Sequence, residues 1–93
     1  MINFKEMVTA ETPEDVIAFM VSTVNGIDIP HLDRLFSRFL ASQFNHYEML
    51  AVCQTMGENG LIKFIEEGKG RIGKGPNWLE PAFVTEGKYG IHE

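Results

Sequence analysis

The sequence is poor in cysteine and has no long apolar run. Its only cysteine, Cys53, excludes an internal disulfide and a cysteine-rich zinc site. No segment approaches the ~18–20 uninterrupted apolar residues that span a bilayer. The N-terminal residues also lack the basic segment and apolar core of a secretory signal. We therefore expect a cytoplasmic protein in a reducing environment, with no membrane partner.

Size and composition indicate one small globular domain. The chain has 93 residues, of which 44% are hydrophobic and 23% are charged, so wholesale disorder is excluded. A chain of this length buries only about 60–65% of the surface that its unfolded form exposes. We expect a single domain, residues 1–93.

The formal net charge is −5, but the charge is unevenly distributed. Residues 1–33 contain one lysine and six acidic residues, whereas residues 34–74 contain six basic and four acidic residues. The acidic total disfavours non-specific binding of nucleic acids. The positive middle segment still allows a local anion site.

The first predicted helix begins at Thr12-Pro13-Glu14-Asp15. These residues offer an N-cap, a proline at the first helical position and acidic side chains at the positive helix end. Residues 16–24 are apolar on almost every side, and Asn25-Gly26 ends the segment. The β-branched content of residues 16–24 leaves a strand as the alternative. A helix of this kind must be covered on several faces.

A second helical region begins near residues 28–30 and carries most of the large side chains. Asn45 and Glu48 have the spacing of a capping box, so residues 30–56 form either one bent helix or two helices that end at Gly57. Residues 61–67 show a short helical spacing of their own. The apolar stripe of the second region has the three-four spacing of a helix and consists of Leu32, Leu35, Phe36, Phe39, Leu40, Phe44 and Tyr47.

These elements predict a mainly α fold, a small domain of three or four helices. The helical body spans about residues 12–67, a basic Gly-rich loop residues 68–76, and an aromatic tail residues 77–93. Aromatic and β-branched residues around Glu86-Gly87 indicate a tail that is irregular or forms a β-hairpin.

The segment from Gly68 to Lys74 matches two nucleotide-binding patterns, G-x-G-x-x-G and G-x-x-x-x-G-K. A P-loop also needs a hydroxyl after the lysine, but Gly75 occupies that position and Pro76 follows. Both patterns need a buried strand before the glycines and a helix after them. Because residues 61–67 have helical spacing, we exclude a P-loop and a dinucleotide fold.

A looser role remains as an alternative for this loop: it would bind a phosphate-bearing ligand, either a nucleotide or a single-stranded nucleic acid. Basic side chains between glycines can contact a phosphate or a nucleic-acid backbone, and an aromatic ring can stack on a base. An exposed linker followed by a core tryptophan explains the same residues. The candidate ligand-binding residues are Lys69, Gly70, Arg71, Gly73, Lys74 and Trp78.

A helix-turn-helix is a weaker alternative. Helices over residues 47–57 and 61–67 would flank Gly57, but the second offers one lysine and two acidic residues toward DNA. Phosphates repel Glu66 and Glu67, so a plain helical hairpin explains the pattern better.

Candidate catalytic residues are few. His46 lies seven residues before Cys53, about 10 Å along a helix, and is too distant to act as its base. Asp28, His31 and Asp33 cluster at a helix start, where caps and solvated groups explain them better than a metal site does. We expect no enzyme, no cofactor and no metal.

The remaining signal is a surplus of apolar residues, which predicts an interface. The candidate interface residues are Phe36, Phe39, Phe44, Tyr47 and Phe83. Symmetric self-association is the commonest use of such a surface. The alternative is a compact monomer whose tail covers the helices. The sequence therefore predicts a small binding or regulatory protein, a homo-oligomer that occupies or sequesters a target protein.

Overall fold

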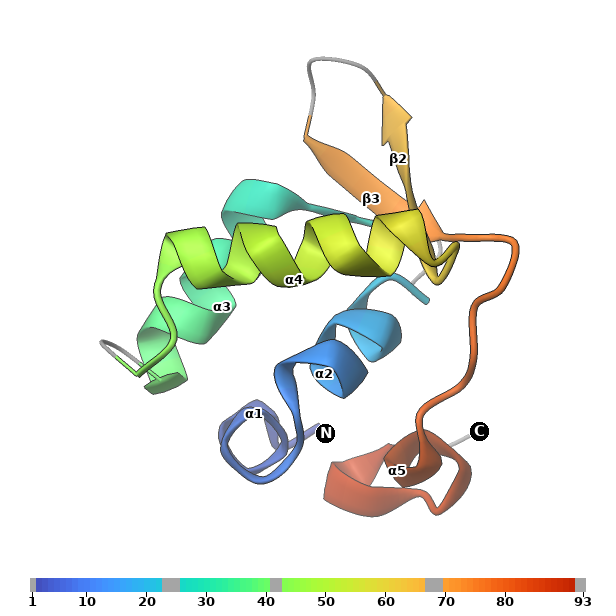
Figure 1. Cartoon of the computed structure of the whole chain (residues 1–93). Coiled ribbons are helices and arrows are strands. Elements are labelled where there is room, and N and C mark those ends of the chain that lie inside the picture. The colour runs from blue at the N-terminus through green and yellow to red at the C-terminus, as the bar shows by residue number, and fades with distance from the viewer. Residues whose placement is uncertain (1, 23–25, 41–42, 67–69, 92–93) are drawn as a thin grey trace.

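The computed structural model describes residues 2–22, 26–40, 43–66 and 70–91, and these ranges form a mainly helical fold with a small antiparallel sheet (Figure 1). The mainly α prediction is confirmed, but the described ranges contain five α-helices and a three-stranded sheet where three or four helices were predicted. In chain order the elements are α1 (Phe4–Ala10), α2 (Pro13–Met20), β1 (Ile27–Asp28), α3 (Ile29–Leu40), α4 (His46–Glu58), β2 (Ile62–Glu66), β3 (Arg71–Lys74), α5 (Ala82–Thr85) and the 3₁₀ helix η2 (Lys88–Gly90).

The helix predicted after Thr12 is present as α2. The Thr12 hydroxyl accepts a hydrogen bond from the Asp15 amide at 3.2 Å, and Pro13 occupies the first turn. The apolar residues Val16 and Ile17 are fully buried. The local capping residues therefore identified the start of this helix correctly.

Helix α1 was not predicted, although its capping residues are visible in the sequence. The Asn3 side chain accepts a hydrogen bond from the Glu6 amide at 3.0 Å. Met7 and Val8 are the residues of α1 that reach the core. The helix has only seven residues, too few for a helical stripe to stand out from the flanking sequence.

The predicted region 30–56 consists of two helices, α3 and α4. The capping box at the start of α4 is formed in both directions. The Asn45 side chain accepts from the Glu48 amide at 2.8 Å, and the Glu48 carboxylate accepts from the Asn45 amide at 3.0 Å. These reciprocal hydrogen bonds satisfy two amides at the helix start, so α4 begins as a helix separate from α3.

Substitution Asn45→Ala is expected to lower the free energy of unfolding by about 1 kcal/mol, because it removes the side-chain half of this cap. Urea denaturation followed by circular dichroism measures the change. Gln54→Ala, at an exposed position of the same helix, is the matched control and should shift stability by less than about 0.5 kcal/mol. Equal losses in both variants would show that the capping box adds nothing.

The helix predicted over residues 61–67 is wrong, because residues 62–66 form strand β2. β2 pairs with β3, and β3 pairs with β1, so the antiparallel sheet has the order β1-β3-β2. The register places Phe64 opposite Ile72 and Ile72 opposite Ile27. A short apolar run fits both a helix and a strand, and here pairing with a segment about ten residues away decides between them.

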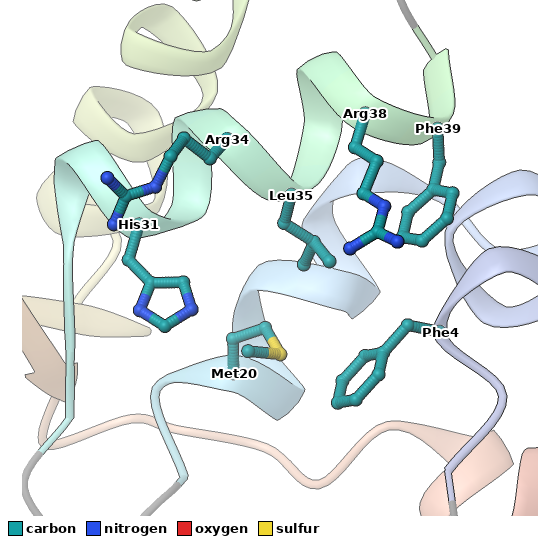
Figure 2. A pocket seen from close by; sticks show the side chains of 7 residues that line it. All are labelled: Phe4, Met20, His31, Arg34, Leu35, Arg38 and Phe39. Atoms are coloured by element: carbon teal, nitrogen blue, oxygen red, sulfur yellow. The ribbon is translucent and has the colours of Figure 1, made fainter.

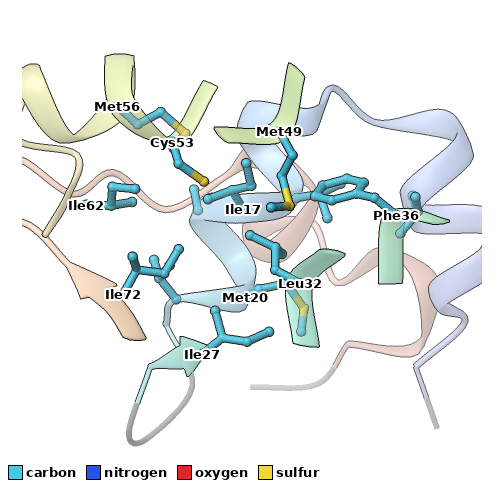
Figure 3. Packing of buried hydrophobic residues seen from close by; sticks show 14 of the residues in the cluster. Ile17, Met20, Ile27, Leu32, Phe36, Met49, Cys53, Met56, Ile62 and Ile72 are labelled. Atoms are coloured by element: carbon cyan, nitrogen blue, oxygen red, sulfur yellow. The ribbon is translucent and has the colours of Figure 1, made fainter. Parts of the chain in front are cut away.

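The core lies between the helices and the sheet (Figure 3). Cys53 and Met49 of α4 belong to it and are almost completely buried. Figure 3 shows side chains from distant parts of the chain packed together, among them Ile17, Leu32, Phe36, Met49, Cys53, Met56, Ile62 and Ile72. One contiguous cluster therefore joins the helices to the sheet.

The predicted hairpin around Glu86-Gly87 is also wrong, because α5 and η2 occupy this part of the tail. The tail packs against the helices. The Trp78 indole N–H donates to the Ala18 carbonyl at 2.9 Å, and the Phe83 ring meets the Phe19 and Tyr89 rings edge-on at 5.8 and 5.7 Å. The apolar helix α2 is thus covered within the same chain.

Candidate functional site

The described part of the Gly-rich segment is mostly a strand and not a loop. Lys69, one of the candidate ligand residues, lies outside the described residues, as does Gly68. Gly70 has a left-handed backbone with φ of 66°, and Arg71 then begins β3. Strand β2 precedes the two nucleotide-binding patterns, so the helix expected before them is wrong. Strand β3 and not a helix follows Gly70, however, and neither nucleotide-binding fold has that arrangement.

Close packing explains two of the glycines in this hairpin. A Cβ atom on Gly75 would lie 2.1 Å from the Gly60 carbonyl oxygen, and one on Gly73 would lie 2.5 Å from Cδ1 of Ile65. The contact at Gly75 is with backbone atoms that cannot turn aside, whereas the contact at Gly73 is with the end of a side chain. The approach of neighbouring protein atoms thus accounts for Gly75, and it favours glycine at position 73.

The structure brings together only part of the predicted anion site. Lys74 lies with its Nζ 4.2 Å from the centre of the Trp78 ring, a cation–π contact. The half-buried Trp78 uses its indole N–H on the Ala18 carbonyl. Arg71 is half-buried and its backbone lies opposite Asp28 in the sheet. A base that stacked on Trp78 would have to compete with Lys74 for the ring. The contacts of Trp78 with Lys74 and Ala18 anchor the tail to the rest of the domain.

Two of the predicted interface residues belong to the core. Phe36 and Phe83 are buried within the chain and leave no ring surface for a partner. Phe39 and Phe44 are half-buried, and the Phe44 ring packs edge-on against Phe36 with centroids 4.9 Å apart. Tyr47 is 80% exposed, so its part in an interface stays a prediction. Spacing in the sequence alone did not distinguish the buried aromatic residues from the exposed one.

Helix α4 presents one continuous exposed stripe. Its buried side is formed by Met49, Cys53 and Met56. The opposite side follows the three-four spacing of a helix and consists of the exposed residues Tyr47, Ala51, Gln54 and Glu58. An aromatic ring therefore stands at the start of this stripe and a carboxylate at its end.

A groove of about 710 Å³ separates the C-terminal half of α4 from β2. Gln54 and Glu58 line it from the helix, and Lys63 and Phe64 line it from the strand. Phe64 is 57% exposed, and its ring edge lies 3.4 Å from the point where a Cβ atom of Gly57 would stand. We call the surface formed by Tyr47, Ala51, Gln54, Glu58, Lys63 and Phe64 the α4–β2 face.

Sequence reasoning missed Lys63 and Phe64 because it placed them on a helix. On a helix they would have belonged to an amphipathic stripe, with Phe64 directed at the core. In strand β2 residues two apart lie on the same side of the sheet, so Ile62 and Phe64 share the side that lines the groove. Ile62 is buried, but Phe64 is 57% exposed and adds an aromatic residue to the face.

Helix α4 lacks the positively charged side chains that a DNA-reading helix needs. The helix residues His46–Glu58 include Glu48 and Glu58 but no lysine or arginine. His46 at the helix start lies with Nδ1 3.2 Å from the Asp33 carboxylate of α3. Phosphate contacts therefore have no cationic partner along this helix.

The remaining candidate chemical groups have structural roles. Burial raises the pKa of the Cys53 thiol to about 11, so the reactive thiolate is scarce at neutral pH. The Asp28 carboxylate accepts from the His31 amide at 2.8 Å at the start of α3, the capping role expected for it. Within the described ranges, no three potential metal ligands lie together.

Comparison with known proteins leaves the site to be interpreted from its geometry. No protein-family model matches the chain, and no curated protein or solved structure resembles it at a significant level. None of the helices in the described ranges is long and apolar enough to cross a bilayer.

Proposed function

We propose that the protein is a non-enzymatic binding protein that contacts a partner protein through the α4–β2 face. The observation that supports this most directly is the combination of two exposed aromatic side chains, Tyr47 and Phe64, with a helix that has no lysine or arginine. Aromatic residues are enriched in protein interfaces and dominate their binding energy. A nucleic acid would instead require cations along the same surface.

The arrangement of elements places α4 beside the sheet. In this chain β1, α3, α4, β2 and β3 follow one another, and β3 pairs with both β1 and β2. Arrangement alone does not define a function, so the proposal is argued from the surface residues. A helix-turn-helix formed by residues 47–57 and 61–67 is not proposed, because residues 62–66 form strand β2.

Self-association is a second candidate use of the same face, but the structure leaves fewer apolar residues available for it than the sequence predicted. The apolar surplus expected from the sequence is largely buried by the tail in the same chain. In the described ranges the large apolar side chains that remain exposed are Tyr47, Phe64, Ile65 and Leu79. Light scattering after gel filtration separates a homo-oligomer from a monomer that awaits another protein.

Binding of a phosphate-bearing ligand by residues 70–78 is supported less well. Its stacking residue, Trp78, already holds contacts with Lys74 and Ala18. We therefore expect affinity for a random-sequence single-stranded oligonucleotide no tighter than about 10⁻⁴ M at physiological salt, the weak limit of non-specific binding. Fluorescence anisotropy with a labelled single strand measures this affinity.

Site-specific photo-crosslinking tests the proposal in the native host. A photoreactive phenylalanine analogue in place of Gln54, at the centre of the α4–β2 face, is expected to give a discrete nuclease-resistant protein adduct. The double variant Tyr47→Ser/Phe64→Ser should reduce the adduct about tenfold, because each lost aromatic contact weakens such interfaces by more than ~1 kcal/mol.

The matched control places the photoreactive group at Leu79, which is 73% exposed and outside the face. This position should give no discrete adduct. Equal adducts from both positions, or an adduct from Gln54 that nuclease removes, would contradict protein binding through this face. Light scattering of the same samples shows whether the adduct is a second copy of the chain.

A further inference from the structure

A separate pocket lies between α1, α2 and α3, away from the residues of the α4–β2 face (Figure 2). Its volume is about 400 Å³, within the range of about 300–1,000 Å³ that is typical of small-molecule sites. Phe4 comes from α1, Met20 from α2 and the remaining lining residues from α3. Figure 2 shows Phe4, Met20, Leu35, Arg38 and Phe39 around a common space, whereas Arg34 extends in the direction of His31 and away from Arg38.

Three nitrogen-bearing side chains from one face of α3 line this pocket: His31, Arg34 and Arg38. They are spaced by three and four residues, which places them above one another on a helix. All three are exposed, and the ion pairs of the described ranges, His46 with Asp33 and Lys88 with Glu86, involve neither arginine. Two guanidinium groups without a carboxylate partner thus line one pocket of a protein whose net charge is −5.

The other side of the pocket is apolar. Phe4, Leu35 and Phe39 are half-buried, and Met20 is almost fully buried. The Arg38 guanidinium lies 5.4 Å from the centre of the Phe39 ring, so the ring supports this side chain at the pocket. The pocket therefore combines an apolar surface with hydrogen-bond donors that match the planar geometry of carboxylates and phosphates.

We propose that this pocket binds a small amphipathic anion, an organic carboxylate or phosphate ester with an aromatic or acyl body. The arginines bind the anionic group, and Phe4, Met20, Leu35 and Phe39 contact the apolar body. Neither inorganic phosphate nor a neutral apolar molecule satisfies both parts of the pocket. The site is independent of the proposed protein-binding face, since it shares no residue with it.

Titration of the ¹⁵N-labelled protein, followed by NMR, tests this proposal with three matched probes: 4-phenylbutyrate, phenyl phosphate and the neutral 4-phenylbutanol. At least one anionic probe should shift amide signals around Phe4, Met20 and residues 31–39. The neutral probe should bind at least about tenfold more weakly, because hydrogen bonds to charged groups are the stronger ones. Comparison of the two anions distinguishes a carboxylate ligand from a phosphate ligand.

Two pairs of variants with the same change in charge provide the control. Arg34→Gln/Arg38→Gln should lose at least about tenfold in affinity for the anion, while Lys5→Gln/Lys88→Gln, at exposed positions outside both proposed sites, should retain it. Leu35→Trp keeps both arginines but fills the pocket, and it should also abolish the shifts. Melting temperatures confirm that each variant folds, and a variant that does not fold is replaced by Arg34→Lys/Arg38→Lys, which should still lose affinity.

Several results would overturn the proposal. Equal affinity for 4-phenylbutanol would show that the pocket recognises only the apolar part of the probe. Equal losses of affinity in the two pairs of charge variants would show that the anion responds to the net charge of the protein and not to the two arginines. Binding of inorganic phosphate alone, or of a short acidic peptide at these residues without binding of either aromatic anion, would assign the arginines to another class of ligand.

Discussion

Replacing Gly75 with alanine is expected to lower the free energy of unfolding by about 2–4 kcal/mol, as overpacking combined with a strained backbone hydrogen bond does. The new methyl group would lie 2.1 Å from the Gly60 carbonyl oxygen and 2.9 Å from the Ile62 nitrogen. Both are backbone atoms, so no side-chain rotation can relieve the overlap. The Gly75 amide also donates to the Leu61 carbonyl at 3.1 Å, and this hydrogen bond would have to move as well.

The same substitution at Gly57 is the matched control and should have the opposite sign. Gly57 lies in the last turn of α4. A Cβ atom there would be 3.4 Å from the Phe64 ring, an ordinary van der Waals contact. Alanine in a helix interior is favoured over glycine by about 0.5–1 kcal/mol. Urea denaturation of both variants measures the difference. A Gly75→Ala protein as stable as the wild type would show that the approach of residues 60 and 75 is not a constraint.

Substitution Phe83→Ala is expected to cost about 3–5 kcal/mol, the range found when a buried phenylalanine is truncated. Phe83 is 2% exposed and meets two aromatic rings edge-on, Phe19 from α2 and Tyr89 from η2. Its loss would open a cavity beneath the tail. The tail should then detach partially, and thermal unfolding should begin at a lower temperature.

Leu79→Ala provides the comparison for the tail. Leu79 is 73% exposed, and its truncation should change stability by less than about 0.5 kcal/mol. Similar stabilities for the two variants would mean that residues 77–91 contribute little to the core. A large loss only in Phe83→Ala would confirm that the tail is part of the domain and that it completes the cover of α2.

The tail is held by polar contacts as well as by rings. The Tyr89 hydroxyl donates to the Glu11 carboxylate, which joins η2 to the segment between α1 and α2. This hydrogen bond, with burial and the nearby acidic side chains, raises the pKa of Tyr89 to about 12. Contacts between residues so distant in sequence left no pattern that local spacing could detect.

The two proposed binding surfaces differ in how visible they were in the sequence. The arginines of α3 gave no signal in the sequence, because the pocket beside them needs Phe4 and Met20 from other helices. The α4–β2 face was hidden for a different reason. Phe64 belongs to it only because residues 62–66 are a strand.

Local signals in the sequence were sufficient for α2, for the start of α4 and for the mainly α class. Capping side chains act on amides within three residues, so Thr12 and Asn45 could be read without knowledge of the rest of the chain. The low cysteine content and the lack of an apolar run likewise needed no structure to interpret.

Only the tertiary structure decided the sheet, the tail and the meaning of the glycines. A short segment such as residues 62–66 has no secondary structure of its own, and its pairing with β3 determines that it is a strand. In the same way, Gly75 follows Lys74 where a P-loop would have a hydroxyl, yet the reason for glycine is the backbone of residue 60. Sequence patterns describe neighbours along the chain, whereas the conformation of these residues is determined by contacts with residues that are distant in sequence.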